Sequence, residues 1–121
     1  MKRFSLSKRE RIVRTAEFKS ALRKSSFFSG KSIKFGVSPN GLGYSRIGVS
    51  LRRENFRLAV QRNKVRRFIK EAYRLNKGRF AKGYDIIIIP KSGILDLGLK
   101  DITTEFLVIA DKALIIGKGD V

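Results

Sequence analysis

Residues 55–75 read NFRLAVQRNKVRRFIKEAYRL and carry two stripes of side chains at helical spacing. At about 100° per residue, one arc of such a helix is apolar and comprises Leu58, Val65, Phe68, Ile69, Ala72 and Leu75. The opposite arc is polar and mostly basic, and comprises Asn63, Arg66, Arg67, Lys70 and Arg74. The pattern predicts an amphipathic helix that begins at Asn55, a residue suited to N-capping, and ends before Gly78.

The basic arc indicates the kind of partner. A nucleic acid backbone presents a row of phosphates, which a cationic face can neutralise with release of counterions. The composition of the whole chain also favours a nucleic-acid partner, because 28 Lys and Arg against 10 Asp and Glu give a formal net charge of +18 on 121 residues. Residues 1–82 hold 24 bases and 4 acids, whereas residues 83–121 hold 4 bases and 6 acids. We therefore expect nucleic acid to bind the first two thirds of the chain.

Composition bounds the class of protein. With 42% hydrophobic residues, the chain can bury one core of ordinary domain size. We expect a basic N-terminal arm over residues 1–14, a single domain over residues 15–116, and a short tail over residues 117–121. The sequence has neither a run of about 20 apolar residues nor a signal-peptide pattern, so we expect a soluble, cytoplasmic protein without a membrane partner. Since cysteine is absent, disulfides and thiolate metal sites are excluded.

The chain also lacks histidine, the side chain most often used for acid–base catalysis near neutral pH. A two-metal nuclease site would need clustered carboxylates, but the ten acids are scattered singly from Glu10 to Asp120. We therefore expect no catalytic residue, no metal site and no small-molecule substrate in this polypeptide. If cleavage is involved, the catalytic groups should belong to another molecule.

The segments before the long helix predict another helix and part of a sheet. Thr15 can cap a helix over residues 16–24, in which Phe18, Ala21 and Leu22 share one face. Alternating apolar residues predict strands over residues 33–37 and 46–51, which should form a hairpin through the turn residues of 39–43. Residues 27–28 favour a short edge strand.

The segments after the long helix complete the fold class. Residues 85–90 read DIIIIP, a β-branched run without alternation that is typical of a central strand covered on both faces. We expect a loop over residues 92–98, and then a helix from Leu99 to about Ile115 with an apolar stripe of Ile102, Phe106, Ile109, Ala113 and Ile116. The order of elements predicts a small α+β sandwich, in which two helices cover one face of the sheet and leave the other partly open.

Two segments resemble the signature of the bacterial ribonuclease P protein subunit, namely RIGVS at residues 46–50 and RNKVRRFIKEAYR at residues 62–74. Glu17-Phe18, Gly30 and the run Gly83-Tyr84-Asp85 support the likeness, which spans roughly residues 9–116. The resemblance implies a fold like the second domain of ribosomal protein S5, with a mixed sheet of about four strands, helices packed on it, and a left-handed β-α-β crossover. Such a crossover is rare, because about 98% of parallel crossovers are right-handed.

The resemblance also implies a function. In that family a catalytic RNA, using Mg²⁺, hydrolyses the phosphodiester bond between the 5′ leader and the mature part of a precursor tRNA. The chain would then be the non-catalytic protein subunit of this endonuclease and would bind no cofactor of its own. Its implied partners are the catalytic RNA, bound through the basic helix, and precursor tRNA, whose leader lies in a cleft between the first helix and the open sheet face.

Roles for individual residues follow from the resemblance, with residues 15–116 as an RNA-binding domain. Residues on and before the long helix would bind RNA, namely Arg53, Arg57, Arg62, Asn63, Lys64, Arg66, Arg67, Lys70 and Arg74. Residues of the first helix and the following strand would line the leader cleft, namely Phe18, Leu22, Lys34 and Gly36. Arginine offers phosphate a planar fork and lysine a point charge, whereas an aromatic ring can stack on an unpaired base for about 1–3 kcal/mol.

This chain departs from the family pattern at several positions. Lys64 stands where arginine is usual, and an acid, Glu54, stands before the helix where lysine is typical. Gly36 and Leu22 stand where aromatic residues are common. We therefore expect the leader cleft to stack less on bases and to depend more on Lys34 and the basic rim.

Two other classes of protein have similar composition. The charge and size of the chain are equally consistent with a structural RNA-binding protein of ribosomal type. Such a protein would co-sediment with ribosomes and would show no preference for leader-bearing precursors. A DNA-compacting basic protein is less favoured, because the core is well patterned and no helix is an obvious reader of base pairs.

Overall fold

The computed structural model describes residues 11–12, 15–76, 78 and 80–112, which form three α-helices and a four-stranded sheet. The elements follow the order α1 (Thr15–Lys24), β1 (Ser26–Ser29), β2 (Ile33–Pro39), β3 (Arg46–Val49), α2 (Ala59–Asn76), β4 (Tyr84–Pro90), the 3₁₀ helix η3 (Ser92–Asp96) and α3 (Leu99–Lys112). The predicted first helix and edge strand are therefore confirmed. Apart from Arg11 and Ile12, the expected arm and tail lie outside the described residues.

The sheet has the strand order β1-β2-β4-β3, with β4 between β2 and β3. β4 pairs in parallel with β3 and antiparallel with β2, while β1 pairs antiparallel with β2. The expected hairpin between residues 33–37 and 46–51 is wrong, because β4 separates these two strands. Burial explains the arrangement: Ile86, Ile87 and Ile88 are fully buried, and a strand of this kind needs cover on both faces. The central position predicted for this strand is confirmed.

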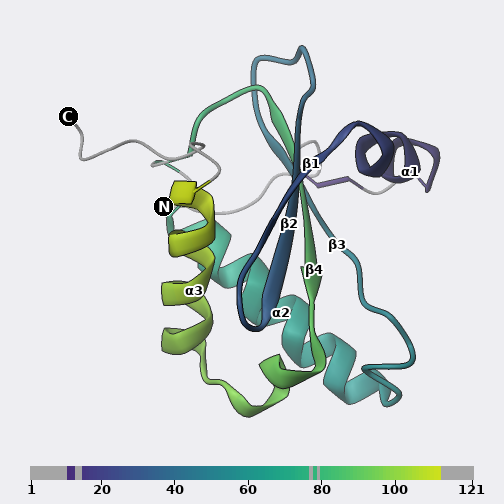
Figure 1. The fold of residues 1–121 in the computed structure, drawn as a ribbon, viewed down its shortest axis with the longest axis vertical. Helices are drawn as coiled ribbons and strands as arrows, with labels where there is room; N and C mark the ends of the chain where they lie inside the picture. Colours follow the sequence, from purple (N-terminus) through teal and green to yellow (C-terminus); the bar gives the residue numbers. More distant parts are fainter. Residues whose placement is uncertain (1–10, 13–14, 77, 79, 113–121) are drawn as a thin grey trace, which may run out of the picture.

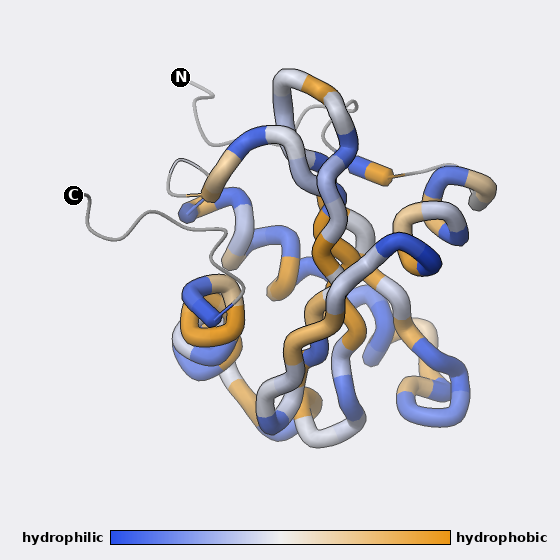
Figure 2. The backbone as a smooth tube through the Cα atoms, turned by 45° about the horizontal axis from the view of Figure 1, so that its top comes forward, coloured by the Kyte–Doolittle hydropathy of each residue, from blue (hydrophilic) through white to orange (hydrophobic). Residues whose placement is uncertain are grey.

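One face of the sheet is covered by α2 and α3, which lie together on the side away from α1 (Figure 1). Aromatic rings fill the junction, with the ring centroids of Phe35 and Phe106 4.9 Å apart and those of Tyr73 and Phe80 5.1 Å apart. Figure 2 shows hydrophobic residues concentrated along the central strands. This core holds one side of α2 and thereby determines which side of the helix meets solvent.

The opposite face of the sheet carries α1 (Figure 1). This helix buries Ala21 in a small second cluster with Ile12 and Ile87. Phe18 and Leu22 pack on the cluster while staying partly exposed, so the apolar face predicted for this helix is confirmed. α1 therefore covers part of the sheet and leaves apolar surface beside it accessible.

α2 begins later than the predicted Asn55, because Phe56 is fully buried and draws the preceding chain into a turn. The backbone N–H groups of Asn55 and Phe56 both donate to the carbonyl oxygen of Arg52 at 3.1 Å. Leu58 takes the N-cap position instead. Its carbonyl oxygen accepts the first helical hydrogen bonds, and its N–H donates to Oε1 of Gln61 at 3.2 Å.

The apolar stripe predicted for α2 is confirmed only in its middle, where the buried residues are Val65, Ile69 and Ala72. Leu58 and Leu75 are exposed because they lie at the two ends of the helix. Tyr73, which the predicted stripe did not include, is buried against Phe80. Packing against α3 therefore widens the buried side of the helix beyond the periodic stripe.

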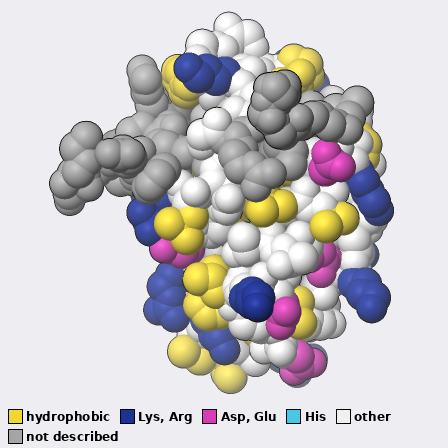
Figure 3. Space-filling model, turned by 90° about the vertical axis from the view of Figure 1, so that its left-hand side faces the viewer, with side chains coloured by type: hydrophobic (Ala, Val, Ile, Leu, Met, Phe, Trp, Pro, Cys, Tyr) yellow, Lys and Arg dark blue, Asp and Glu magenta, His cyan; other side chains and the backbone are white. Residues whose placement is uncertain are grey.

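α3 buries the predicted stripe residues Ile102, Phe106 and Ile109, whereas Ala113 and Ile116 lie outside the described residues. The segment expected as a loop contains the short helix η3, which buries Ile94. Figure 3, which views the molecule from the α3 side, shows acidic and basic side chains interspersed with apolar ones. In the part of the chain that the structure describes, no helix is long and apolar enough to cross a membrane.

Candidate nucleic-acid interface

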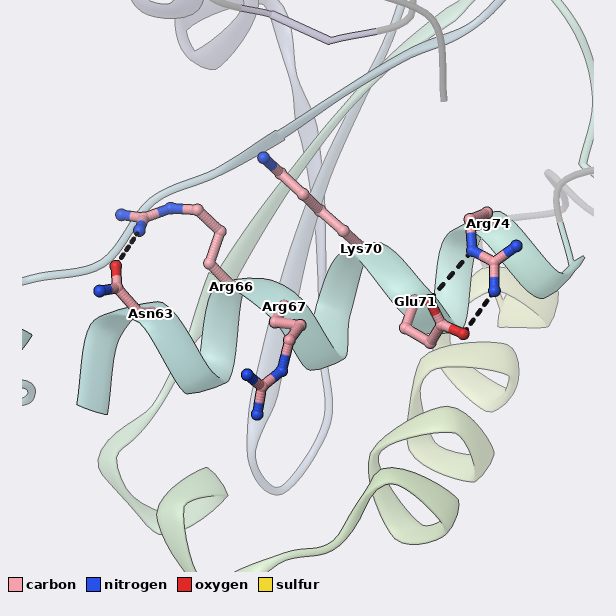
Figure 4. A pocket seen from close by; sticks show the side chains of 6 residues that line it. All are labelled: Asn63, Arg66, Arg67, Lys70, Glu71 and Arg74. Atoms are coloured by element: carbon pink, nitrogen blue, oxygen red, sulfur yellow. Dashed lines mark hydrogen bonds and ion pairs between the residues drawn. The ribbon is translucent and has the colours of Figure 1, made fainter. Parts of the chain in front are cut away.

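Five exposed or half-exposed side chains project from the solvent side of α2 and form the α2 ridge, namely Asn63, Lys64, Arg66, Arg67 and Lys70. All but Lys64 line an open groove of about 350 Å³ together with Glu71 and Arg74 (Figure 4). Nη1 of Arg66 donates to Oδ1 of Asn63 at 3.2 Å, which orients both side chains. The basic arc recognised in the sequence thus forms a continuous surface that faces solvent.

Two cations of the ridge flank one aromatic ring. Nζ of Lys64 and Cζ of Arg67 lie 5.8 and 5.7 Å from the ring centroid of Phe68. Both residues are exposed, so these cation–π contacts leave their charged ends in solvent. Neither forms an ion pair with any of the described acidic residues. Each is therefore available to an external anion.

Arg74, at the end of the groove, is engaged within the protein. Its Nε and Nη2 donate to the two carboxylate oxygens of Glu71 at 3.0 and 2.5 Å. This forked contact lowers the pKa of Glu71 and raises the pKa of Arg74. Because the pair carries no net charge, Arg74 offers phosphate less than the ridge cations do.

Arg62 is also engaged, since its Nη1 donates to the backbone carbonyl oxygens of Phe56 and Arg57 at 2.8 and 3.0 Å. It thereby holds the loop that precedes α2. The exposed side chains of Arg53 and Arg57 lie on this loop, beside the start of the helix. The nine predicted RNA-binding residues therefore fall into three groups: the five of the ridge, two on the loop, and two arginines held by backbone carbonyl oxygens or by a carboxylate.

A smaller pocket of about 130 Å³ lies between α2, β3 and residues 11–12. Arg11, Arg66 and Lys70 all line it. Nε of Arg11 is buried and has no hydrogen-bond partner among the described residues. Burial, together with the charges of Arg11 and Arg66, lowers the pKa of Lys70. An oxyanion in this pocket would accept a hydrogen bond from Nε of Arg11 and would offset the repulsion among the three cations.

Arg11 is not among the binding residues predicted from the sequence. A basic arm without periodicity carries no signal for where it contacts the rest of the fold. Its place follows from Ile12, whose N–H donates to the carbonyl oxygen of Ile47 at 2.9 Å and whose side chain is buried. The short apolar pair at residues 12–13, which follows a basic run, is the only sequence signal for this contact.

Replacing Lys70 by methionine is expected to stabilise the protein, because the change removes a partly buried charge that two arginines repel. Because its pKa is lowered in the folded state, charged Lys70 destabilises the fold at neutral pH, and this effect disappears as the pH rises through the lowered pKa towards 10.5, the ordinary pKa of lysine. We expect the melting temperature at low salt and pH 7 to rise by roughly 2–5 °C. The difference from the wild type should shrink as the pH approaches 10.5.

Thermal unfolding of both proteins over a pH series measures this effect. Lys64→Met is the matched control, because Lys64 is exposed on the same helix and its replacement should leave the melting temperature nearly unchanged. A Lys70→Met protein that melts below the wild type at pH 7 would contradict the proposed repulsion.

An ion-pair network lies at one end of the sheet face that carries α1. Nε and Nη2 of Arg46 donate to the two carboxylate oxygens of Asp85 at 2.9 and 2.7 Å, and Nη1 lies 3.3 Å from Oε1 of Glu17. The hydrogen bond to Asp85 is the main cause that raises the pKa of Arg46. Three segments that carry the family resemblance therefore meet here, and they tie α1 to β3 and β4.

Two of the predicted leader-cleft residues come from α1 and pack on the sheet. Phe18 lies over Gly48 of β3, where an added Cβ atom would be 2.8 Å from Cε2 of the phenylalanine. Leu22 packs against the small cluster that contains Ile87 of β4 and is half-buried. These contacts place both residues between the helix and the sheet, with part of each side chain accessible.

The other two predicted leader-cleft residues lie on β2. Lys34 is half-exposed, whereas Gly36 is buried beneath the ring of Phe27 from β1. Phe27 is not among the predicted site residues, because an edge-strand pattern does not show which face its side chains join. The four predicted residues are thus brought to one face of the sheet, together with an aromatic ring that the sequence did not assign to it.

The sequence matches known proteins over most of its length. A family described as Ribonuclease P matches residues 6–114. Relatives named "Ribonuclease P protein component" include one from Clostridium botulinum (strain 657 / Type Ba4), which is 35% identical over 107 residues that cover 88% of this chain and 96% of the relative. Another, from Syntrophus aciditrophicus, is 32% identical over 112 residues and covers 93% of each chain.

The structure is similar to solved structures of the same kind. The RNase P protein from Staphylococcus aureus aligns with a TM-score of 0.81 at 23% identity, over 89% of this chain and 98% of that one. The RNase P protein from Thermotoga maritima aligns with a TM-score of 0.76 at 25% identity, over 84% of this chain and 96% of that one. These likenesses support the α+β fold, with its mixed four-stranded sheet and three helices.

Proposed function

This chain belongs to the ribonuclease P protein family, and on that premise we propose that it binds the catalytic RNA of the enzyme and the 5′ leader of precursor tRNA. As a protein component of ribonuclease P, it takes part in tRNA processing within a ribonucleoprotein. Binding both RNAs would promote the endonucleolytic removal of the leader.

The α2 ridge is the observation that carries this proposal. Its cations project from one side of a helix whose other side is held by the core, and Lys64, Arg66 and Arg67 form no ion pair with the described acidic residues. Arg11 extends the charge towards β3, where its buried Nε has no partner among the described residues. A folded RNA offers phosphates in fixed positions, so a rigid row of cations can meet several at once.

The face that carries α1 supports the second part of the proposal. A leader is single-stranded, so its bases can stack on aromatic side chains while its phosphates contact lysine. Phe18, Leu22 and Lys34 are all partly accessible on this face. It lies on the opposite side of the sheet from the core that holds α2, so one molecule can contact the catalytic RNA and the leader together.

The protein's contribution in this proposal is binding and positioning. The catalytic RNA, using Mg²⁺, would hydrolyse the phosphodiester bond. Cations that neutralise RNA phosphates reduce the repulsion between catalytic RNA and precursor, so the protein should lower the Mg²⁺ concentration that the reaction needs.

Reconstitution with the host's catalytic RNA at low Mg²⁺ tests this function. We expect precursor tRNA to be cleaved faster with the protein than without it. We also expect the protein to increase affinity for leader-bearing precursor by roughly tenfold or more relative to mature tRNA, because each stacked base contributes about 1–3 kcal/mol. Cleavage by the polypeptide alone would contradict the proposal, and co-sedimentation with ribosomes without a leader preference would favour a structural RNA-binding protein instead.

A further inference from the structure

A row of four residues crosses the open face of the sheet, one from each strand: Phe27, Gly36, Ile87 and Gly48. Each is the register partner of the next, so all four lie on the side that carries α1. An aromatic ring lies over each glycine, Phe18 from α1 over Gly48 and Phe27 from β1 over Gly36. The face therefore presents two rings, one on either side of a central isoleucine.

Phe27 occupies the space that a side chain at position 36 would need. A Cβ atom on Gly36 would lie 2.8 Å from Cε1 of Phe27 and 3.0 Å from Cβ of Ser25, closer than side chains pack. Phe27 is nevertheless 46% exposed, and Nζ of Lys34 lies 4.8 Å from its ring centroid. An aromatic ring and a cation are thus presented together to solvent.

The hairpin that carries Phe27 is anchored to the rest of the fold at two points. Oε2 of Glu105 on α3 accepts the backbone N–H groups of residues 32–33 at 2.6 and 2.9 Å. Nζ of Lys91, just after β4, donates to the carbonyl oxygen of Gly30 at 2.7 Å. Because the strand is held in place, the ring is already positioned before any ligand binds, which reduces the entropy lost on binding.

We propose that Phe27 stacks on an unpaired base of the leader, and that Lys34 beside it binds a phosphate of the same strand. The ligand is single-stranded RNA, because only unpaired bases can place a face on an aromatic ring. An exposed cation–π contact is weak, so a phosphate can draw the ammonium group of Lys34 away and uncover the ring. The inference rests on the proposed function and identifies a residue of the leader cleft.

This inference revises the expectation that Gly36 weakens stacking in the cleft. Glycine at position 36 leaves room for the ring of the neighbouring strand, so the aromatic surface is supplied from β1 instead of β2. The cleft keeps an aromatic surface on each side of Ile87, although Leu22 and Gly36 stand where aromatic residues are common in the family.

Phe27→Ala should weaken binding of leader-bearing precursor tRNA by the reconstituted enzyme by roughly 5- to 150-fold, as expected for one lost base stack. Binding of mature tRNA, which has no leader, should stay unchanged. Val108→Ala, at an exposed apolar residue of α3, is the matched control and should alter neither. Equal weakening for both RNAs would make Phe27 a structural residue and overturn the proposal.

A double variant tests the geometry directly. Phe27→Ala/Gly36→Phe should regain affinity for the leader-bearing precursor, because removal of the first ring relieves the shortest contact at position 36 and leaves only the contact with Ser25 to be relieved by a small shift. Gly36→Phe alone should lower the melting temperature, since two rings would then compete for one place. A double variant that is folded and binds the catalytic RNA normally, yet regains no affinity for the leader, counts against the proposal.

A spectroscopic variant separates this inference from the proposed function. The chain contains no tryptophan, so Phe27→Trp introduces a single indole, whose fluorescence an oligoribonucleotide of leader sequence should quench. Val108→Trp should show no quenching. If leader preference is present but the indole at position 27 is unquenched, the inference alone fails. If quenching occurs without leader preference, the stacking site stands and the proposed function fails.

Discussion

Replacing Lys64, Arg66 and Arg67 by alanine is expected to weaken binding of the catalytic RNA by roughly 100-fold at 0.1 M salt. The three cations face solvent in whole or in part, and their contacts are with Asn63 and the ring of Phe68 on the same helix. Each lost phosphate contact should also reduce the slope of log K against log salt concentration by about 0.7–0.9. A salt titration of binding, followed by fluorescence anisotropy, measures both quantities.

The matched control for this variant removes the same charge from elsewhere. Lys82, Lys100 and Lys112 are exposed and lie outside α2. Alanine at these three positions lowers the net charge by the same amount as in the ridge variant. A difference in RNA affinity between the two triple variants therefore reports the position of the charge and not its total. Equal losses of affinity and slope would mean that binding follows net charge alone, which would contradict the α2 ridge as the interface.

Phe106→Ala is expected to lower the free energy of unfolding by about 3–5 kcal/mol. The ring is fully buried, and its centroid lies 4.9 Å from that of Phe35, 5.5 Å from that of Phe80 and 6.5 Å from that of Tyr73. Truncation would therefore leave a cavity where α2, α3 and the sheet meet. Since domains of this size are stable by only about 5–15 kcal/mol, urea denaturation should detect the loss clearly.

The same variant should bind the catalytic RNA more weakly, although Phe106 is a buried residue of α3 and does not belong to the ridge. The core beneath α2 positions the ridge, so partial unfolding removes the binding surface. Saturating RNA should recover part of the lost stability, because it binds the folded state. Val108→Ala, at a 53% exposed position of the same helix, should stay within about 0.5 kcal/mol of the wild type. RNA affinity that is unchanged in a largely unfolded Phe106→Ala protein would contradict this dependence.

Elements with a strong period were predictable from the sequence. The apolar stripe of α3 and the apolar face of α1 follow from local backbone geometry. The structure confirms the face of α1 and, among the residues it describes, the stripe of α3. The isoleucine run of β4 predicted a strand covered on both faces, which is also confirmed. The predicted beginning of α2 at Asn55 was wrong. Burial of Phe56 stabilises a turn at this point by more than the N-capping preference of Asn55 stabilises a helix.

Strand neighbours were harder to predict than strands. The turn residues between β2 and β3 predicted a direct hairpin, but turn chemistry reports only that the chain reverses. Which strands pair depends on burial across the whole sheet. Because β4 is apolar on both faces, it lies in the centre of the sheet, between β2 and β3.

The sequence by itself determined that this protein has a basic amphipathic helix, a central strand covered on both faces and no histidine chemistry, because composition and periodicity are properties of the chain read residue by residue. Only the tertiary structure decided which cations are available and which ring lines the cleft. Arg62 is held by a loop, Arg11 lies beside β3, and Phe27 covers Gly36. Each of these facts depends on contacts between segments that the folded backbone brings together. The pattern of side chains along the chain does not specify those contacts.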